Sequence, residues 1–150
     1  MKEQSLSLAA EDAEDLEIVS ARLQDAVAQI KDLVYLPKSR RFAGLFNRFM
    51  WEEADRRGGG DLRVQTGLHF DGVLSAKSRN LKSHAPNTVV SLLAIQFTPR
   101  GAEDPGGTIE LVFAGGGAIR LDVESIDAGL QDVSGEWAAR GRPEHETEGG

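Results

Sequence analysis

The sequence of 150 residues contains no cysteine. This absence excludes disulfide bonds, a thiol nucleophile and metal or iron–sulfur sites built on cysteine. The chain also lacks any apolar run near the roughly 18 residues that a membrane-spanning helix needs. Its acidic first residues have no apolar stretch of the kind found in a secretion signal. We therefore expect a globular, cytoplasmic protein without a membrane partner.

The net charge of −7 is distributed unevenly along the chain. Residues 1–30 carry a net charge of −5, residues 31–82 carry +5 and residues 83–150 carry −7. A basic middle segment can bind an anionic partner, or it can pair with the acidic ends within the fold. We favour pairing within the fold, chiefly with the acids at the start of the chain, which are Glu11, Asp12, Glu14, Asp15 and Glu17.

Two segments have helical spacing. Asp12 precedes an apolar pattern with a period near 3.6 and can cap a helix over residues 12–25. Near the other end, Ser125 precedes Ile126, Leu130 and Val133, which are four and then three residues apart. This spacing predicts a short second helix.

Between these segments the apolar residues alternate as they do in strands. The alternation predicts strands over residues 29–36, 41–51, 62–76, 88–98 and on both sides of Gly115–Gly117, with a further short strand at 5–9. In the clearest strand, 62–76, we expect Leu62, Val64, Leu68, Phe70 and Leu74 to face the core, with a bulge or bend at Gly72. In the strand 29–36, we expect Ile30, Val34 and Leu36 to share one face.

The predicted fold class is α+β. It has an N-terminal helix, an antiparallel meander of about six strands that curls into a roll or partial barrel, and a short C-terminal helix. The order of elements is similar in outline to pleckstrin-homology-like rolls. We expect one globular domain over residues 1–137 and a disordered tail over residues 138–150.

Three consecutive glycines, Gly115–Gly117, pose the question of a phosphate-binding loop. Such a loop leads into a helix whose N-terminus faces the anion. Here the glycines lead into Ala118–Val123, where Ile119 and Leu121 alternate with polar residues. The segment therefore predicts a β-hairpin in which glycine provides the turn.

Only one pair of residues suggests acid–base chemistry. His69 and Asp71 fall on the same face of the predicted strand, so the carboxylate can orient the imidazole. An exposed pair of structural side chains has the same pattern, and we favour that interpretation. Neither an activated nucleophile nor ligand spacing for a metal is present, so we predict no catalytic residue, cofactor or metal.

Basic residues of the middle segment form the second candidate site. Lys38, Arg40 and Arg41 lie in or beside a predicted turn, and Arg56 and Arg57 lie in a predicted polar loop. Aromatic residues lie near them, as in surfaces that bind single-stranded nucleic acid. The sequence pI of about 5.0 argues against general affinity for nucleic acid.

Several segments together resemble one family. These are DAEDLEIVSARLQDAV, LPKSRRFAGLFNRFMWE, LHFDGVLSAKSRN, LLAIQF and GGTIELVFAGGGAIRLDVESI, which begin at residues 12, 36, 68, 92 and 106. They are similar to Domain of Unknown Function 2948, a family of small alphaproteobacterial proteins. The resemblance implies a bacterial protein and provides no catalytic residue, cofactor or partner to transfer.

Three functions stay open on the sequence alone. The first is a non-enzymatic binding or adaptor domain for a protein partner, which we favour. The second is a small-ligand-binding protein or enzyme whose pocket gathers scattered polar residues, and the third is single-stranded nucleic-acid binding through the basic middle segment. An exposed apolar patch favours the adaptor domain, and a deep pocket favours the ligand-binding protein or enzyme. A continuous basic groove favours nucleic-acid binding.

Overall fold

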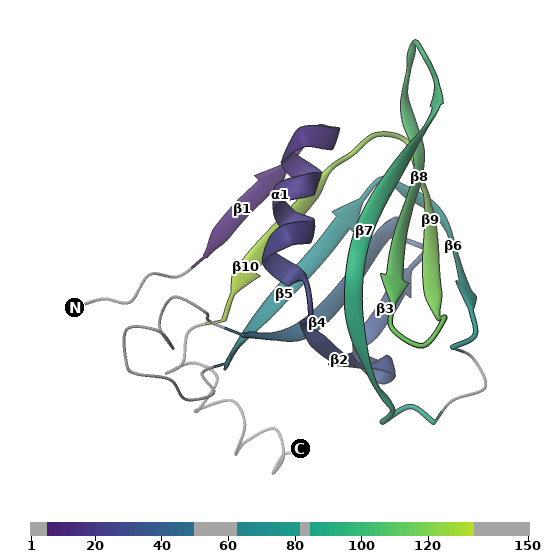
Figure 1. The fold of residues 1–150 in the computed structure, drawn as a ribbon. Helices are drawn as coiled ribbons and strands as arrows, with labels where there is room; N and C mark the ends of the chain where they lie inside the picture. Colours follow the sequence, from purple (N-terminus) through teal and green to yellow (C-terminus); the bar gives the residue numbers. More distant parts are fainter. Residues whose placement is uncertain (1–5, 50–62, 82–84, 134–150) are drawn as a thin grey trace.

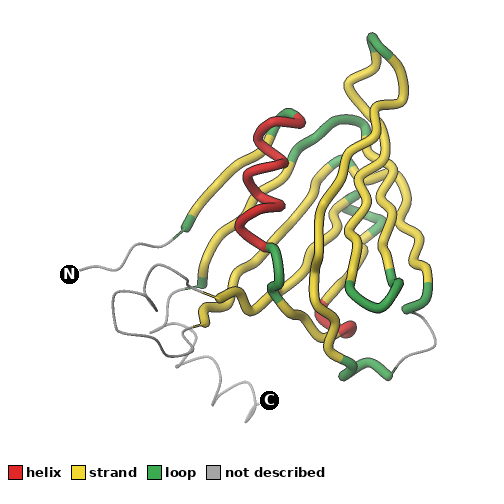
Figure 2. Tube along the Cα trace, in the orientation of Figure 1, coloured by secondary structure: helices red, strands yellow, loops and turns green. Residues whose placement is uncertain are grey.

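The computed structural model describes residues 6–49, 63–81 and 85–133. The described part of the chain is mostly antiparallel sheet with one α-helix and one short 3-10 helix (Figure 2). The elements are β1 Ser7–Ala10, α1 Ala13–Leu23, β2 Val27–Gln29, η1 Ile30–Asp32, β3 Leu33–Leu36, β4 Arg41–Phe49, β5 Arg63–Asp71, β6 Val73–Arg79, β7 Val89–Gly101, β8 Asp104–Phe113, β9 Ala118–Val123 and β10 Ala128–Asp132.

The strands form a single curled sheet in the order β1-β10-β5-β4-β2-β7-β8-β9-β6, and β3 pairs with β4 beside β2. Each described strand pair is antiparallel. The long strand β7 bends between the two halves of the sheet, and its hairpin with β8 projects beyond the rest of the fold (Figure 1). The sheet is open because β6 and β3 do not pair with each other.

Helix α1 lies between β1 and β7 and covers the hollow of the sheet (Figure 1). It begins where the sequence predicts, because the Asp12 side chain accepts a hydrogen bond of 2.8 Å from the Asp15 N–H. Leu16, Val19 and Leu23 are buried on one face. The core around them gathers the largest buried side chains, including Phe46, Phe70 and Phe113.

The glycine hairpin is confirmed. Gly115 and Gly116 have φ angles of +90° and +98° and connect β8 to β9. The alternating residues on both sides are buried, namely Ile109, Leu111, Phe113, Ile119, Leu121 and Val123. The glycines therefore form a turn between strands and do not begin a helix.

The side-chain alternation shifts at two places. The strand predicted over residues 29–36 is interrupted by η1, which contains Ile30. Val34 and Leu36 share one face as predicted, but that face is exposed, and Leu33 and Tyr35 face inward. The predicted strand 62–76 bends at Gly72 and continues as β6, where an irregularity lies between Val73 and Ser75. Leu68 and Phe70 are buried as predicted, but Leu74 is 42% exposed because of this shift.

The predicted fold is wrong in two respects. Ten strands are present in the described residues rather than about six, and the predicted helix after Ser125 is the strand β10. The short strand predicted at residues 5–9 is present as β1 and precedes α1. β10 lies between β1 and β5, so backbone pairing on both edges outweighs the local helical spacing. The chain is not a simple meander, since β5 pairs with β10 and β6 with β9, and the pleckstrin-homology-like outline is not matched. The predicted tail over 138–150 lies outside the described residues.

Candidate functional site

The predicted pair His69 and Asp71 lies on the outer face of β5. The His69 Nε2 atom is 3.6 Å from the Asp71 Oδ2 atom, and the His69 side chain is 38% exposed. Arg41, the cross-strand partner of Asp71, donates two hydrogen bonds of 2.8 and 3.2 Å to the Asp71 carboxylate. These hydrogen bonds lower the pKa of Asp71 and raise the pKa of Arg41.

The Asp71 carboxylate is thus hydrogen-bonded to Arg41 and not to His69. Among the described residues no hydroxyl group is hydrogen-bonded to the His69 imidazole, so a nucleophile next to a base is not assembled there. The imidazole lies over Gly129 of β10, where an added Cβ would come within 2.9 Å of Nε2. The cluster is best described as a set of cross-strand side-chain contacts that join β4, β5 and β10.

The structure describes three of the five predicted basic residues. Arg40 and Arg41 lie at the turn between β3 and β4, together with exposed Lys38, whereas Arg56 and Arg57 lie outside the described residues. Arg40 donates a hydrogen bond of 2.6 Å to Glu124. In the described part of the chain, the ion pairs of the basic middle segment use Asp71, Glu110, Glu124 and Asp132, and none uses an acid of α1.

The sequence did not lead us to predict the buried ion pair between Arg48 and Asp132. Arg48 of β4 donates hydrogen bonds of 3.1 and 2.8 Å to Asp132 of β10, and their side chains are 8% and 3% exposed. The Thr66 hydroxyl and the Leu6 N–H also donate to the Asp132 carboxylate, at 2.7 and 2.9 Å. One signal was available, because Arg48 has the same parity in its strand as the buried residues Phe42 and Phe46.

Burial raises the pKa of the Asp132 carboxyl group, but the hydrogen bonds from Arg48, Thr66 and Leu6 lower it, and the net direction is downward. The carboxylate is therefore ionised and accepts four hydrogen bonds from the protein itself. Because these hydrogen bonds use the acceptor capacity of the carboxylate, Asp132 joins β10 to β4, to β5 and to Leu6 just before β1, rather than binding a ligand.

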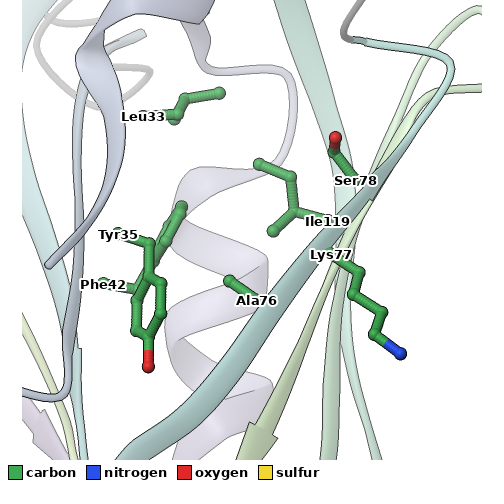
Figure 3. Close-up of a pocket in the computed structure, with 7 residues that line it drawn as sticks. All are labelled: Leu33, Tyr35, Phe42, Ala76, Lys77, Ser78 and Ile119. Carbon is green, nitrogen blue, oxygen red and sulfur yellow. The ribbon is translucent and has the colours of Figure 1, made fainter. Parts of the chain in front are cut away.

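The strongest candidate for a binding site lies where the sheet fails to close. A cavity of about 530 Å³ lies between β3 and β6, and we call it the seam cleft. Figure 3 shows the residues that line it, with the Lys77 side chain extending away from the others. The lining residues are Leu33, Tyr35, Phe42, Ala76, Lys77, Ser78 and Ile119.

The seam cleft is pinned at one end. The Tyr35 hydroxyl donates a hydrogen bond of 2.8 Å to the Val73 carbonyl, and the Val73 N–H donates one of 2.9 Å to the Arg40 carbonyl. Beyond Val73, β6 pairs with β9 along one edge and has no strand partner on the other in the described sheet. The cleft thus has an apolar wall, a free strand edge and a few polar groups at its rim.

Among the described residues, no group of three or more His, Cys, Asp or Glu side chains is arranged to hold a metal ion. Within the same residues, no helix has the length and apolar character to cross a bilayer.

The structure is therefore a small β domain whose antiparallel sheet is open between β3 and β6, where the seam cleft lies. Residues 6–145 match the family model described as "Protein of unknown function (DUF2948)", and the chain belongs to this family. No curated protein and no solved structure matches the chain.

Proposed function

We propose that this protein is a non-enzymatic binding module and that the seam cleft is its binding site. The observation that carries the proposal is a cavity of about 530 Å³ with a mainly apolar lining beside an unpaired strand edge. This volume falls within the range of roughly 300–1,000 Å³ typical of ligand pockets. An adaptor or ligand-binding role in the cytoplasm of a bacterium is part of this proposal.

The chemistry of the cleft supports binding rather than catalysis. Its polar side chains are Tyr35, Lys77 and Ser78, and the Tyr35 hydroxyl already donates to Val73. His69 and Asp71, the pair best suited to acid–base work, do not line the cleft. The titratable groups of the lining are Tyr35 and Lys77. The Tyr35 hydroxyl donates to the Val73 carbonyl and the Lys77 side chain extends away from the other lining residues (Figure 3), so the two are not positioned as an acid–base pair.

The ion pairs of the basic residues weigh against nucleic-acid binding. Arg40, Arg41 and Arg48 each pair with a carboxylate at 2.6–2.8 Å, so their charge is matched within the fold. We expect no binding to a labelled single-stranded oligonucleotide at physiological salt. Micromolar binding that weakens steeply with added salt would favour the nucleic-acid function instead.

A fluorescent probe tests the proposed site. Anilinonaphthalene sulfonate, an aromatic anion, should bind the full chain saturably, with its apolar rings in the cleft. Filling the cavity by Ala76→Leu or Ala76→Phe should abolish this binding, whereas Val89→Phe, at a position 57% exposed on β7, should not. Circular dichroism of each variant checks that the fold is retained.

A second measurement tests whether the bound probe lies in the cleft. Because the sequence has no cysteine, Ser78→Cys introduces a single thiol within the cleft. The bound probe should slow the reaction of this thiol with a maleimide. Probe binding that survives both cavity-filling substitutions and leaves the thiol unprotected would overturn the proposed site.

A further inference from the structure

The edge of β6 that borders the seam cleft has the features of a docking strand. β6 is the last strand of the sheet and pairs only with β9, so alternate N–H and C=O groups along its other edge have no strand partner in the described sheet. An unpaired edge readily accepts a further strand. Here the edge lies beside a preformed cavity rather than against solvent alone, as Figure 3 shows.

The side chains of β6 set the pattern that an added strand must follow. Ala76, Lys77 and Ser78 all border the cavity, but the Lys77 side chain extends away from it (Figure 3) and, like Arg79, is exposed. Paired strands place directly opposed residues on the same face of a sheet. An added strand would therefore place every second side chain against Leu33, Tyr35 and Phe42, and the others beside Lys77 and Arg79.

The outer face next to this edge carries more positive than negative charge, with Lys77, Arg79 and Arg120 set against Glu110, which lies opposite Arg120 on β8. Lys77 lies directly opposite Arg120 of β9, and neither forms an ion pair with another described residue. Arg79 has only a long contact of 3.7 Å with Glu110. Like charges directly opposite each other destabilise a sheet, and a carboxylate beside Lys77 on the free side of β6 would offset this repulsion.

The same charges select against a second copy of this chain. Antiparallel pairing of two β6 edges would bring Lys77 and Arg79 of one copy against the same residues of the other, which is unfavourable. An acidic strand meets no such barrier.

We infer that the seam cleft accepts an extended segment of a partner protein in which apolar and acidic residues alternate. The segment pairs its backbone with the free edge of β6, its apolar side chains fill the cavity and its carboxylates lie beside Lys77 and Arg79. This inference rests on the proposed function and names the class of partner. It is a case of strand addition, in which main-chain hydrogen bonds provide affinity and alternate side chains provide specificity.

The probe for the test is a synthetic fluorescein-labelled peptide of alternating valine and glutamate, seven residues long to match β6. Fluorescence anisotropy with the full chain should show saturable binding. Lys77→Glu should weaken this binding by roughly three- to tenfold, since reversal replaces an exposed attraction with a repulsion. Arg22→Glu, an equal charge change at the exposed last turn of α1, serves as the matched control.

Two further peptides separate strand addition from charge attraction alone. A peptide of alternating valine and lysine should prefer the Lys77→Glu variant to the wild type. Two N-methylated forms of the acidic peptide, modified at odd or at even positions, should differ by at least about tenfold, because only one set of amides faces β6.

The outcomes distinguish this inference from the proposed function. Binding of anilinonaphthalene sulfonate in the cleft without binding of the acidic peptide leaves the proposed function standing and overturns the inference. Peptide binding that is equally strong for both N-methylated forms, or that Arg22→Glu weakens as much as Lys77→Glu, also overturns it. If neither anilinonaphthalene sulfonate nor the acidic peptide binds, both the inference and the proposed binding site are overturned.

Discussion

Arg48 and Asp132 lie 84 residues apart in the sequence and form a two-pronged ion pair inside the fold. Removing one partner leaves the other charged and buried, so Asp132→Leu or Arg48→Met should lower the free energy of unfolding by about 3–5 kcal/mol. The double variant Arg48→Met/Asp132→Leu should lose clearly less than the sum of the two single losses. Urea denaturation measures all three, and additive losses would show that the two residues do not act as a pair.

The lowered pKa of Asp132 predicts how stability depends on pH. A carboxyl group whose pKa is lower in the folded state stabilises the fold above its unfolded pKa, about 3.9, and loses this contribution as the pH falls through the folded pKa. The free energy of unfolding should therefore decrease below about pH 4, and Asp132→Asn should make that decrease shallower. Asp71→Asn, in the more exposed pair with Arg41, should change the slope less. Parallel curves for the wild type and Asp132→Asn would contradict the assignment.

A Cβ at residue 129 would collide with the His69 imidazole in its present position. Gly129→Ala should destabilise the fold by roughly 1–3 kcal/mol, because the new methyl group displaces the imidazole. In the background of His69→Ala the same substitution should cost much less. Thermal unfolding of the four proteins in this cycle measures the coupling, and additive losses would show that the two residues do not contact each other.

Phe70 and Leu74 lie before and after Gly72, so substituting each tests whether the inward and outward alternation of side chains shifts there. Phe70 is fully buried, so Phe70→Ala should lower the free energy of unfolding by about 3–5 kcal/mol. Leu74 is 42% exposed, and Leu74→Ala should cost less than about 1 kcal/mol. Equal losses would mean that both side chains face the core.

The hydroxyl of Tyr35 pins the end of the seam cleft at Val73. Tyr35→Phe removes this single donor and should lower the free energy of unfolding by about 0.5–1.5 kcal/mol. Hydrogen exchange should become faster at the β6 amides next to Val73 and stay unchanged in the glycine hairpin. Unchanged exchange at both places would show that the hydrogen bond does not hold the seam.

The sequence predicts those parts of the fold whose information is local. The hairpin at Gly115–Gly117 and the capped helix after Asp12 each depend on a few neighbouring residues, and both are confirmed. The shifts of alternation at η1 and after Gly72 depend on how the chain packs against distant strands, which a periodic pattern does not encode. The strand β10 was missed for the same reason, since its two neighbours come from the beginning and the middle of the chain.

The candidate site shows the same division. The sequence correctly places His69 and Asp71 on one face, because residues two apart in a strand always share a face. It does not indicate the seam cleft, because the lining residues come from four strands and are mostly ordinary apolar residues. These residues line a cavity only because β3 and β6 do not pair with each other.

The pairing of β1 with β10 has a consequence for how the protein is made. Leu8 is aligned with Leu130, and β1 has no other strand partner in the described sheet. At a synthesis rate of about 5–20 residues per second, the first strand waits on the order of ten seconds for its partner to leave the ribosome. During that interval β5 also lacks β10 on one edge, so the nascent chain exposes an incomplete sheet. The consecutive hairpins of β7, β8 and β9 can form earlier, which makes them the natural starting point of folding and β10 the strand that completes it.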